Sequence, residues 1–131
     1  MINPYRIKNL KVLQISVGHT QTTLIDTKHN SFVYDGYSYE QISTFRVKQI
    51  SNGSNSSIFI DLNDNIWGFG SNYSGRLGLD MLEEVSLPVK IMNVKVKQVS
   101  TNYTQTIILD LDNNVWVCGS YLHAMVISVD N

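Results

Sequence analysis

Residues 47–72 read VKQISNGSNSSIFIDLNDNIWGFGSN, and residues 96–121 read VKQVSTNYTQTIILDLDNNVWVCGSY. The two stretches align without a gap and are identical at 11 of 26 positions, and the other apolar positions keep their apolar character. A third, more divergent copy covers residues 12–36 and begins 35 residues before the first stretch. Such self-similarity is the signature of a repeat protein, so the repeat decides the fold class.

Each copy is predicted to form short strands rather than helices. Apolar runs rich in Ile, Val, Trp and Phe alternate with clusters of Asn, Asp, Gly and Ser, and no apolar stripe at helical spacing persists. Asn and Asp tolerate the positive φ that tight turns require, so the cluster before the last run of each copy is a hairpin turn. The central copy has expected strands at 47–51, 57–62 and 66–70, and the turns lie at 28–30, 63–65 and 112–114.

The composition describes an ordinary globular domain. The chain has 131 residues, of which 43% are hydrophobic and 16% charged. A net charge of −1 supplies no broad positive field to hold phosphates, so nucleic-acid binding is not expected. Asn, Ser and Ile occur 13, 14 and 13 times, a bias that AT-rich coding sequences produce, as in some protists and giant viruses.

The sequence also indicates where in the cell the protein is expected. No apolar run approaches membrane-spanning length, and the N-terminal residues are polar where a secretory signal would be apolar. The single cysteine, Cys118, cannot form an internal disulfide. We therefore expect an intracellular protein of the cytoplasm or nucleus, or of the virion if the source is viral, with no membrane partner.

The stretch after the last predicted strand of the central copy resembles the repeat of the regulator-of-chromosome-condensation family. That repeat has an aromatic-Gly-x-Asn-x-x-Gly-Gln-Leu-Gly run and a later proline, and Arg76 stands where the family prefers glutamine. The chain departs from the family at its usual histidine, where it has Gln21, Ser56 and Gln105, and the third copy loses the pattern after Gly119. The matching residues are Phe69, Gly70, Asn72, Gly75, Leu77, Gly78 and Pro88.

The resemblance implies an all-β fold, a β-propeller whose four-stranded blades usually number seven. This chain is expected to supply about three of them. Residues 4–16 align with residues 88–100, which predicts a strand from a preceding blade at the start of the chain. The expected single repeat domain comprises this outer strand at 1–11, a short repeat at 12–46, a complete repeat at 47–95 and a repeat at 96–131 that is degenerate at its end.

Several residues that could form a chemical site have structural explanations. Residues 61–65 resemble the start of a calcium loop, but Ile66 and Asn72 stand where glycine and glutamate belong, and a hairpin turn explains the acids. Cys118 has no recognisable partner base and is expected to be a small buried hydrophobe. No catalytic residue, metal or cofactor is predicted, and the histidines without a second ligand at metal spacing are His19, His29 and His123.

The conspicuous residues in and around the glycine-rich stretch also have structural explanations. The glycines of residues 68–78 are expected to serve tight turns rather than to cradle a phosphate, because no well-capped helix follows them. Trp67 and Trp116 hold equivalent positions and are expected in the core between blades. One charge cluster is not required by the repeat and is the candidate for a partner contact: Asp80, Glu83 and Glu84.

These observations favour a binding role. A propeller presents loops on two faces, and no acid, base, nucleophile or metal site is assembled, so we expect a non-enzymatic protein-binding or scaffold module. The family resemblance alone implies one alternative, guanine-nucleotide exchange or regulation of a small GTPase. The compositional bias suggests another, a structural subunit of a viral or other large assembly.

Self-association is also expected. The chain starts with a surplus outer strand and ends on a copy whose fourth strand is doubtful, and an unpaired strand edge invites pairing with another chain. We predict a head-to-tail homo-oligomer in which residues 2–8 of one subunit complete the blade formed by residues 96–120 of the next. Two subunits would then close a ring of about six blades, within the usual range. The alternatives are that residues 122–131 form the fourth strand themselves, or that a larger partner supplies the missing blades.

Overall fold

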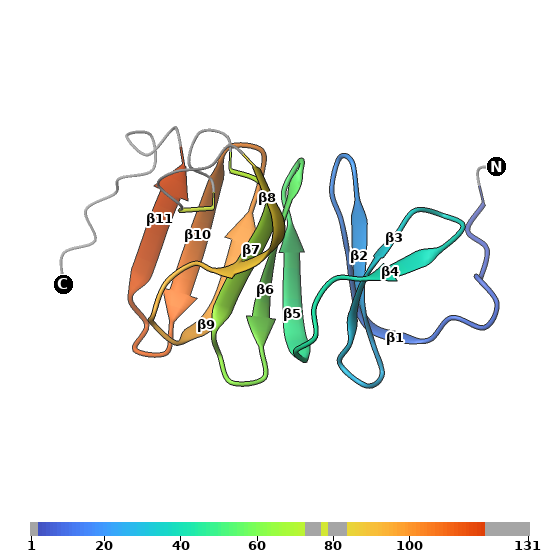
Figure 1. Ribbon diagram of the computed structural model, residues 1–131, viewed down its shortest axis with the longest axis horizontal. Coiled ribbons are helices and arrows are strands. Elements are labelled where there is room, and N and C mark those ends of the chain that lie inside the picture. The colour runs from blue at the N-terminus through green and yellow to red at the C-terminus, as the bar shows by residue number, and fades with distance from the viewer. Residues whose placement is uncertain (1–2, 73–76, 79–83, 120–131) are drawn as a thin grey trace.

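The computed structural model describes residues 3–72, 77–78 and 84–119. They form three antiparallel sheets that follow one another along the chain and stand side by side in a row (Figure 1). The expectation of an all-β fold built as part of a propeller, with about three blades, is confirmed. The described residues contain no helix that could cross a membrane.

Each sheet is a blade in which strands that are consecutive in the sequence are hydrogen-bonded neighbours. Blades 1 and 2 have four strands, and three strands of blade 3 lie among the described residues. Blade 1 consists of β1 (Val12–Val17), β2 (Thr22–Asp26), β3 (Ser31–Tyr34) and β4 (Tyr39–Gln41). Blade 2 consists of β5 (Val47–Asn52), β6 (Ser56–Asp61), β7 (Ile66–Ser71) and β8 (Glu84–Lys90), and blade 3 of β9 (Val96–Thr101), β10 (Gln105–Asp110) and β11 (Val115–Gly119).

The first strand of each blade begins at the first residue of a repeat, namely Val12, Val47 or Val96. A bulge follows directly, since the register with the second strand shifts near this residue in all three blades. An extra residue in one strand changes which side chains share a face. In blade 2, Val47 and Ile50 therefore both pack in the same hydrophobic cluster.

The apolar core lies between blades. Alternate residues of β6 face opposite ways, as expected for a strand buried on both sides, and all six are buried. Phe59 packs with Ile25 of blade 1, whereas Ile58 and Ile60 pack with Val99 of blade 3. Burial of apolar area therefore fixes each blade to the next.

Residues 3–11 contain no strand and pair with none of the described strands. The prediction that residues 1–11 provide the outer strand of a preceding blade requires a neighbour that is not among the described residues, and it stays a prediction. The degenerate end of the third repeat, from residue 120, lies outside the described residues.

Candidate interaction surfaces

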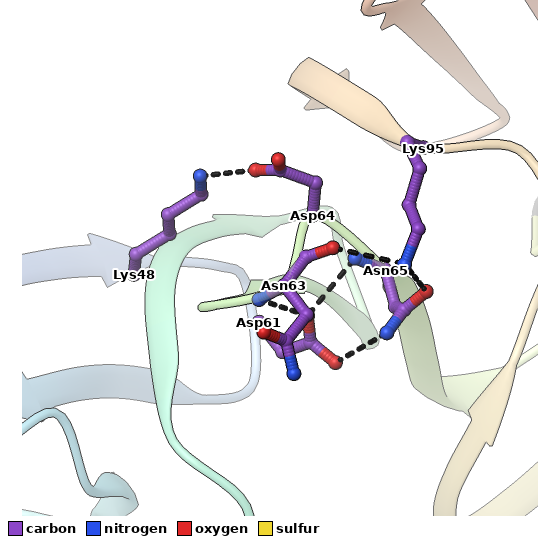
Figure 2. Close-up of polar contacts among 6 residues, drawn as sticks. All are labelled: Lys48, Asp61, Asn63, Asp64, Asn65 and Lys95. Atoms are coloured by element: carbon purple, nitrogen blue, oxygen red, sulfur yellow. Dashed lines mark hydrogen bonds and ion pairs between the residues drawn. The ribbon is translucent and has the colours of Figure 1, made fainter.

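At one end of the row, the turn between the second and third strands of each blade is organised by an aspartate. In blade 2, Oδ1 of Asp61 accepts the backbone N–H groups of Asn63 at 2.8 Å and Asn65 at 2.9 Å (Figure 2). Oδ2 accepts the side-chain amide of Asn65 at 3.1 Å and the indole N–H of Trp67 at 2.9 Å. The carboxylate thus accepts hydrogen bonds from its own hairpin, which confirms that residues 61–65 form a hairpin turn.

The same turn recurs in the other blades. Asp110 accepts the indole N–H of Trp116 at 2.9 Å and two backbone N–H groups of its turn. Asp26 likewise accepts two backbone N–H groups, but Phe32 stands at the tryptophan position and offers no donor. The sequence signal for this role is an asparagine four residues after each of these aspartates.

These hydrogen bonds set the acidity of the aspartates. Burial pushes the pKa of Asp61 upward, but the hydrogen bonds from Trp67, Asn65 and Asn63 outweigh it, so the pKa lies below the ordinary value. For Asp110, the hydrogen bond from Trp116 is the largest influence and also lowers the pKa. Both groups are therefore ionised near neutral pH.

Two lysines form polar contacts with residues of the Asp61 turn. Lys48 forms an ion pair with Asp64 within blade 2. Lys95, which precedes blade 3, donates to the carbonyl oxygen of Asn63 at 3.1 Å and to the side-chain oxygen of Asn65 at 2.9 Å (Figure 2). The exposed position of the Lys48 pair limits its contribution to stability, but Lys95 joins two blades.

At the opposite end of the row, the hairpins between the first and second strands of the three blades lie next to one another (Figure 1). We call these hairpins the crown loops: residues 17–20, 52–55 and 101–103. They line a groove of about 710 Å³. The backbone N–H groups of His19 and Thr20 donate to the carbonyl oxygen of Ser54 at 3.1 and 3.2 Å, so two of the loops are directly tied.

The groove presents polar and aromatic side chains from all three blades. His19 of blade 1, Asn55 of blade 2 and Tyr103 of blade 3 are exposed there, and the Tyr103 side chain is 68% exposed. Thr20 Oγ1 donates to Asn55 Oδ1 at 3.0 Å. Sequence reasoning did not identify this surface, although equivalent positions of the three copies supply it.

Of the predicted acidic contact site, Glu84 lies within the described residues. It opens β8, is exposed, and lines a hollow of about 410 Å³ together with Thr20 of blade 1 and Gly70 of blade 2. The other two acids, Asp80 and Glu83, lie outside the described residues.

The remaining candidate residues lie apart from one another. His19 belongs to a crown loop, whereas His29 sits in the turn at the other end with Nδ1 3.1 Å from the carbonyl oxygen of Val47. Within the described ranges, no three His, Cys, Asp or Glu residues are grouped so that they could hold a metal ion. Burial raises the pKa of the Cys118 thiol, which disfavours the reactive thiolate. His123 lies outside the described residues.

The two tryptophans differ in their surroundings. Trp67 stacks on Phe45 with ring centroids 4.4 Å apart and packs against the cluster between blades 1 and 2, which confirms its predicted place in the core. Trp116 keeps the equivalent hydrogen bond to Asp110 but is 43% exposed. The expected place in the core between blades is therefore met by Trp67, whereas Trp116 is partly exposed.

Four-stranded antiparallel blades joined through their inner strands define the class of the protein, a β-propeller repeat protein. Residues 63–109 match the family model of the regulator of chromosome condensation (RCC1) repeat. Residues 63–109 are therefore similar to a repeat of this family, as the sequence pattern predicted. No curated protein sequence matches the chain.

Solved structures with a similar fold support the assignment of the chain to the β-propeller class. Human WBSCR16 superposes with a TM-score of 0.77 and 16% identity, over 88% of this chain and 35% of that one. Yeast RCC1 (Prp20), solved bound to Kap60, gives 0.73 and 17%, over 88% of this chain and 31% of that one. Prp20p from Saccharomyces cerevisiae, in a study of its binding to Gsp1p and histones, gives 0.74 and 13%, over 83% and 31%. The chain thus spans about a third of the length of each.

Proposed function

We propose that the chain is a non-enzymatic protein-binding module of β-propeller type. The observation that carries this proposal is the groove of about 710 Å³ between the three crown loops. Loops held by a rigid scaffold are where binding residues concentrate, and exposed tyrosine is enriched at the centres of protein interfaces. Tyr103, Asn55 and His19 supply one exposed side chain from each blade.

The structural roles of the acidic residues support a binding function over catalysis. Asp26, Asp61 and Asp110 hold the turns at the end opposite to the groove, and their carboxylate oxygens accept hydrogen bonds from their own hairpins. A general acid or base needs a pKa near the working pH, whereas the pKa values of these three are lowered.

The structural relatives support a protein as the partner. Yeast RCC1 was crystallised with Kap60, and Prp20p was studied for binding to Gsp1p and histones. By extension, the partner of this chain is a protein that docks on the crown loops or on the hollow beside Glu84.

A double variant, Asn55→Ala with Tyr103→Ala, tests this proposal. Cross-linking and affinity capture from cells of the source, followed by mass spectrometry, should identify a protein that the wild type retains and the variant loses. Tyr37→Ala is the matched control, because Tyr37 is 96% exposed on the β3–β4 turn and lies outside the groove. Failure of the wild type to retain any protein, together with turnover of a small molecule, would contradict the proposal.

A second candidate is regulation of a small GTPase, including guanine-nucleotide exchange, and the family match at residues 63–109 favours it. The test is release of labelled nucleotide from a panel of small GTPases. Acceleration of one of them would support this role, and no acceleration across the panel would remove it.

We also propose that the module self-associates head to tail as a homo-oligomer. The alignment of residues 4–16 with residues 88–100 supports this proposal, because it gives residues 2–8 the sequence character of an outer strand, which can complete the blade formed by residues 96–120 of another subunit. Deletion of residues 1–8 should reduce the native mass in light scattering. A truncated protein that keeps its native mass and stability would argue against strand exchange.

A further inference from the structure

The crown loop of blade 2 has unpaired hydrogen-bond donors, whereas its carbonyl and amide oxygens are paired. The carbonyl oxygen of Ser54 already accepts the N–H groups of His19 and Thr20 of blade 1. The side-chain oxygen of Asn55 accepts the hydroxyl of Thr20 at 3.0 Å, and its carbonyl oxygen accepts the N–H of Ser71 at 2.9 Å.

The donors of the same two residues lie in the groove. They are the backbone N–H of Ser54, the backbone N–H of Asn55 and the side-chain amide of Asn55, and none of them has an acceptor among the described residues. A loop with paired oxygens and unpaired N–H groups is suited to a partner that brings oxygen acceptors.

The geometry of the loop brings two of these donors together. The turns at residues 18–21 and 53–56 are closed by the same backbone hydrogen bond, from the N–H of the first residue to the carbonyl of the fourth, at 2.8 and 2.9 Å. The two central N–H groups of the first turn converge on one oxygen, at 3.1 and 3.2 Å. The equivalent pair in the second turn, on Ser54 and Asn55, is therefore arranged to hold one oxygen as well.

One glycine explains why the N–H of Asn55 stays unpaired. In blade 3, the side-chain oxygen of Asn102 accepts the equivalent N–H, that of Thr104, at 3.0 Å. Gly53 stands at the position of Asn102 in blade 2 and has no side chain to do this. A Cβ on Gly53 would lie 2.4 Å from the carbonyl oxygen of Asn102, so the packing of blade 3 requires glycine there.

The surroundings favour an anion at these donors. The peptide unit between Ser54 and Asn55 accepts two N–H groups at its oxygen, and linked hydrogen bonds strengthen one another, which makes its own N–H a stronger donor. The described residues that line the groove include no Asp or Glu that would repel an anion. Glu84 lines the neighbouring hollow instead.

We propose that the crown loop of blade 2 binds a carboxylate on the surface of the partner protein, the side chain of an aspartate or glutamate. One carboxylate oxygen accepts the N–H groups of Ser54 and Asn55, and the other accepts the side-chain amide of Asn55. A carboxylate fits better than a neutral carbonyl, because it has two oxygens and forms stronger hydrogen bonds with N–H groups. The proposal rests on the proposed protein-binding function and specifies the chemistry of the partner.

Capped tripeptides titrated into the isotope-labelled full chain test this proposal by NMR. Acetyl-Gly-Glu-Gly-amide should shift the backbone amide resonances of Ser54 and Asn55 saturably. Acetyl-Gly-Gln-Gly-amide is the matched neutral probe and should bind roughly tenfold more weakly, since hydrogen bonds to a charged group are stronger. Equal binding of both peptides, or no shift at these two residues with the glutamate peptide, would overturn the proposal.

Asn55→Asp removes a donor while keeping the contact of this residue with blade 1. Aspartate retains the oxygen that accepts the Thr20 hydroxyl but replaces the amide donor with a negative charge. Binding of the glutamate peptide should fall by more than about tenfold, with the melting temperature near that of the wild type. Tyr37→Asp is the matched control, because it adds the same charge at an exposed position outside the groove, and it should bind like the wild type. Undiminished binding by folded Asn55→Asp would contradict the site.

A second pair of variants tests the backbone donor. Asn55→Ala removes the side-chain amide and keeps the N–H, whereas Asn55→Pro removes both. The alanine variant should retain weakened binding of the glutamate peptide and the proline variant none, with thermal melts to establish that each is folded. Equal binding by the two would overturn the role of the N–H. A chain that captures a protein through Tyr103 but binds no glutamate peptide would overturn the carboxylate assignment alone, while the protein-binding function would stand.

Discussion

The backbone carbonyl of Asp64 accepts a hydrogen bond of 2.8 Å from the N–H of Val96, the first residue of the next blade. One blade earlier, the carbonyl of His29 accepts the N–H of Val47 at the same distance. Asp64 and His29 have positive φ angles of 67° and 70°. The left-handed residue thus closes its own hairpin and also directs a carbonyl to the next blade.

Asp64→Val should therefore destabilise the protein. A β-branched residue disfavours the left-handed conformation by about 1–2 kcal/mol, and any relaxation of φ would also turn the carbonyl away from Val96. Asp64→Asn is the matched control and should be close to wild type, because asparagine tolerates this conformation. The free energy of unfolding from urea titration should be measured for both variants. Equal stability of the two variants would show that φ at this position does not matter.

The turn around Asp64 was predictable from sequence because the residues that favour it are adjacent in the chain. Residues 63–65 and 112–114 combine Asn and Asp between apolar runs, and positive φ occurs at Asp64 and Asn113 as expected. The inter-blade hydrogen bond was not predictable, because a backbone carbonyl has no sequence signature. The same holds for the indole donor to Asp61, which lies six residues away around the hairpin.

Asp61→Ala should destabilise blade 2 by about 2–4 kcal/mol, since it removes acceptors for two backbone N–H groups and the indole N–H of Trp67. Asp26→Ala is the matched comparison, because Phe32 offers no indole N–H and fewer donors are left unpaired. The free energy of unfolding from urea titration should therefore fall further for Asp61→Ala. A larger loss for Asp26→Ala would contradict the assigned role of Trp67.

The lowered pKa values of Asp26, Asp61 and Asp110 predict a loss of stability in acid. A carboxyl whose pKa is lower in the folded state takes up its proton first in the unfolded chain. Its contribution is therefore complete above the ordinary value of 3.8 and is lost as the pH falls toward the folded value. Urea midpoints should be constant from about pH 7 to 5 and fall below about pH 4. The Asp61→Asn, Asp110→Asn double variant should show a shallower fall, and an equally steep one would exclude these carboxyls as the cause.

The crown groove could not be predicted from sequence for a different reason. Its lining comes from residues 17–20, 52–55 and 101–103, which are separated by whole repeats and meet only when the blades pack. Neither His19 nor Tyr103 lies in a motif, since neither is shared between the copies. Glu84 was predicted from charge alone, and its position beside Thr20 of blade 1 depends on the same packing.

Replacement of Gly70 should be strongly harmful. Its φ is 101°, and an added Cβ would lie 2.5 Å from the carbonyl oxygen of Asn55 and 2.9 Å from the Cα of Ser56, both backbone atoms that cannot move alone. Gly36 is the matched control, because its φ is 99° but an added Cβ would meet nothing within 4 Å.

Gly36→Ala should therefore cost only the strain of the backbone conformation, about 1–2 kcal/mol. Gly70→Ala should cost roughly 3 kcal/mol or more, because the hairpin strands β6 and β7 must also separate to admit the methyl group. Free energies of unfolding from urea titration, with the slope of the transition checked for equality, measure the difference. If the two variants were equally destabilised, the close approach of β7 to Asn55 would not limit this site, and φ alone would explain the glycine.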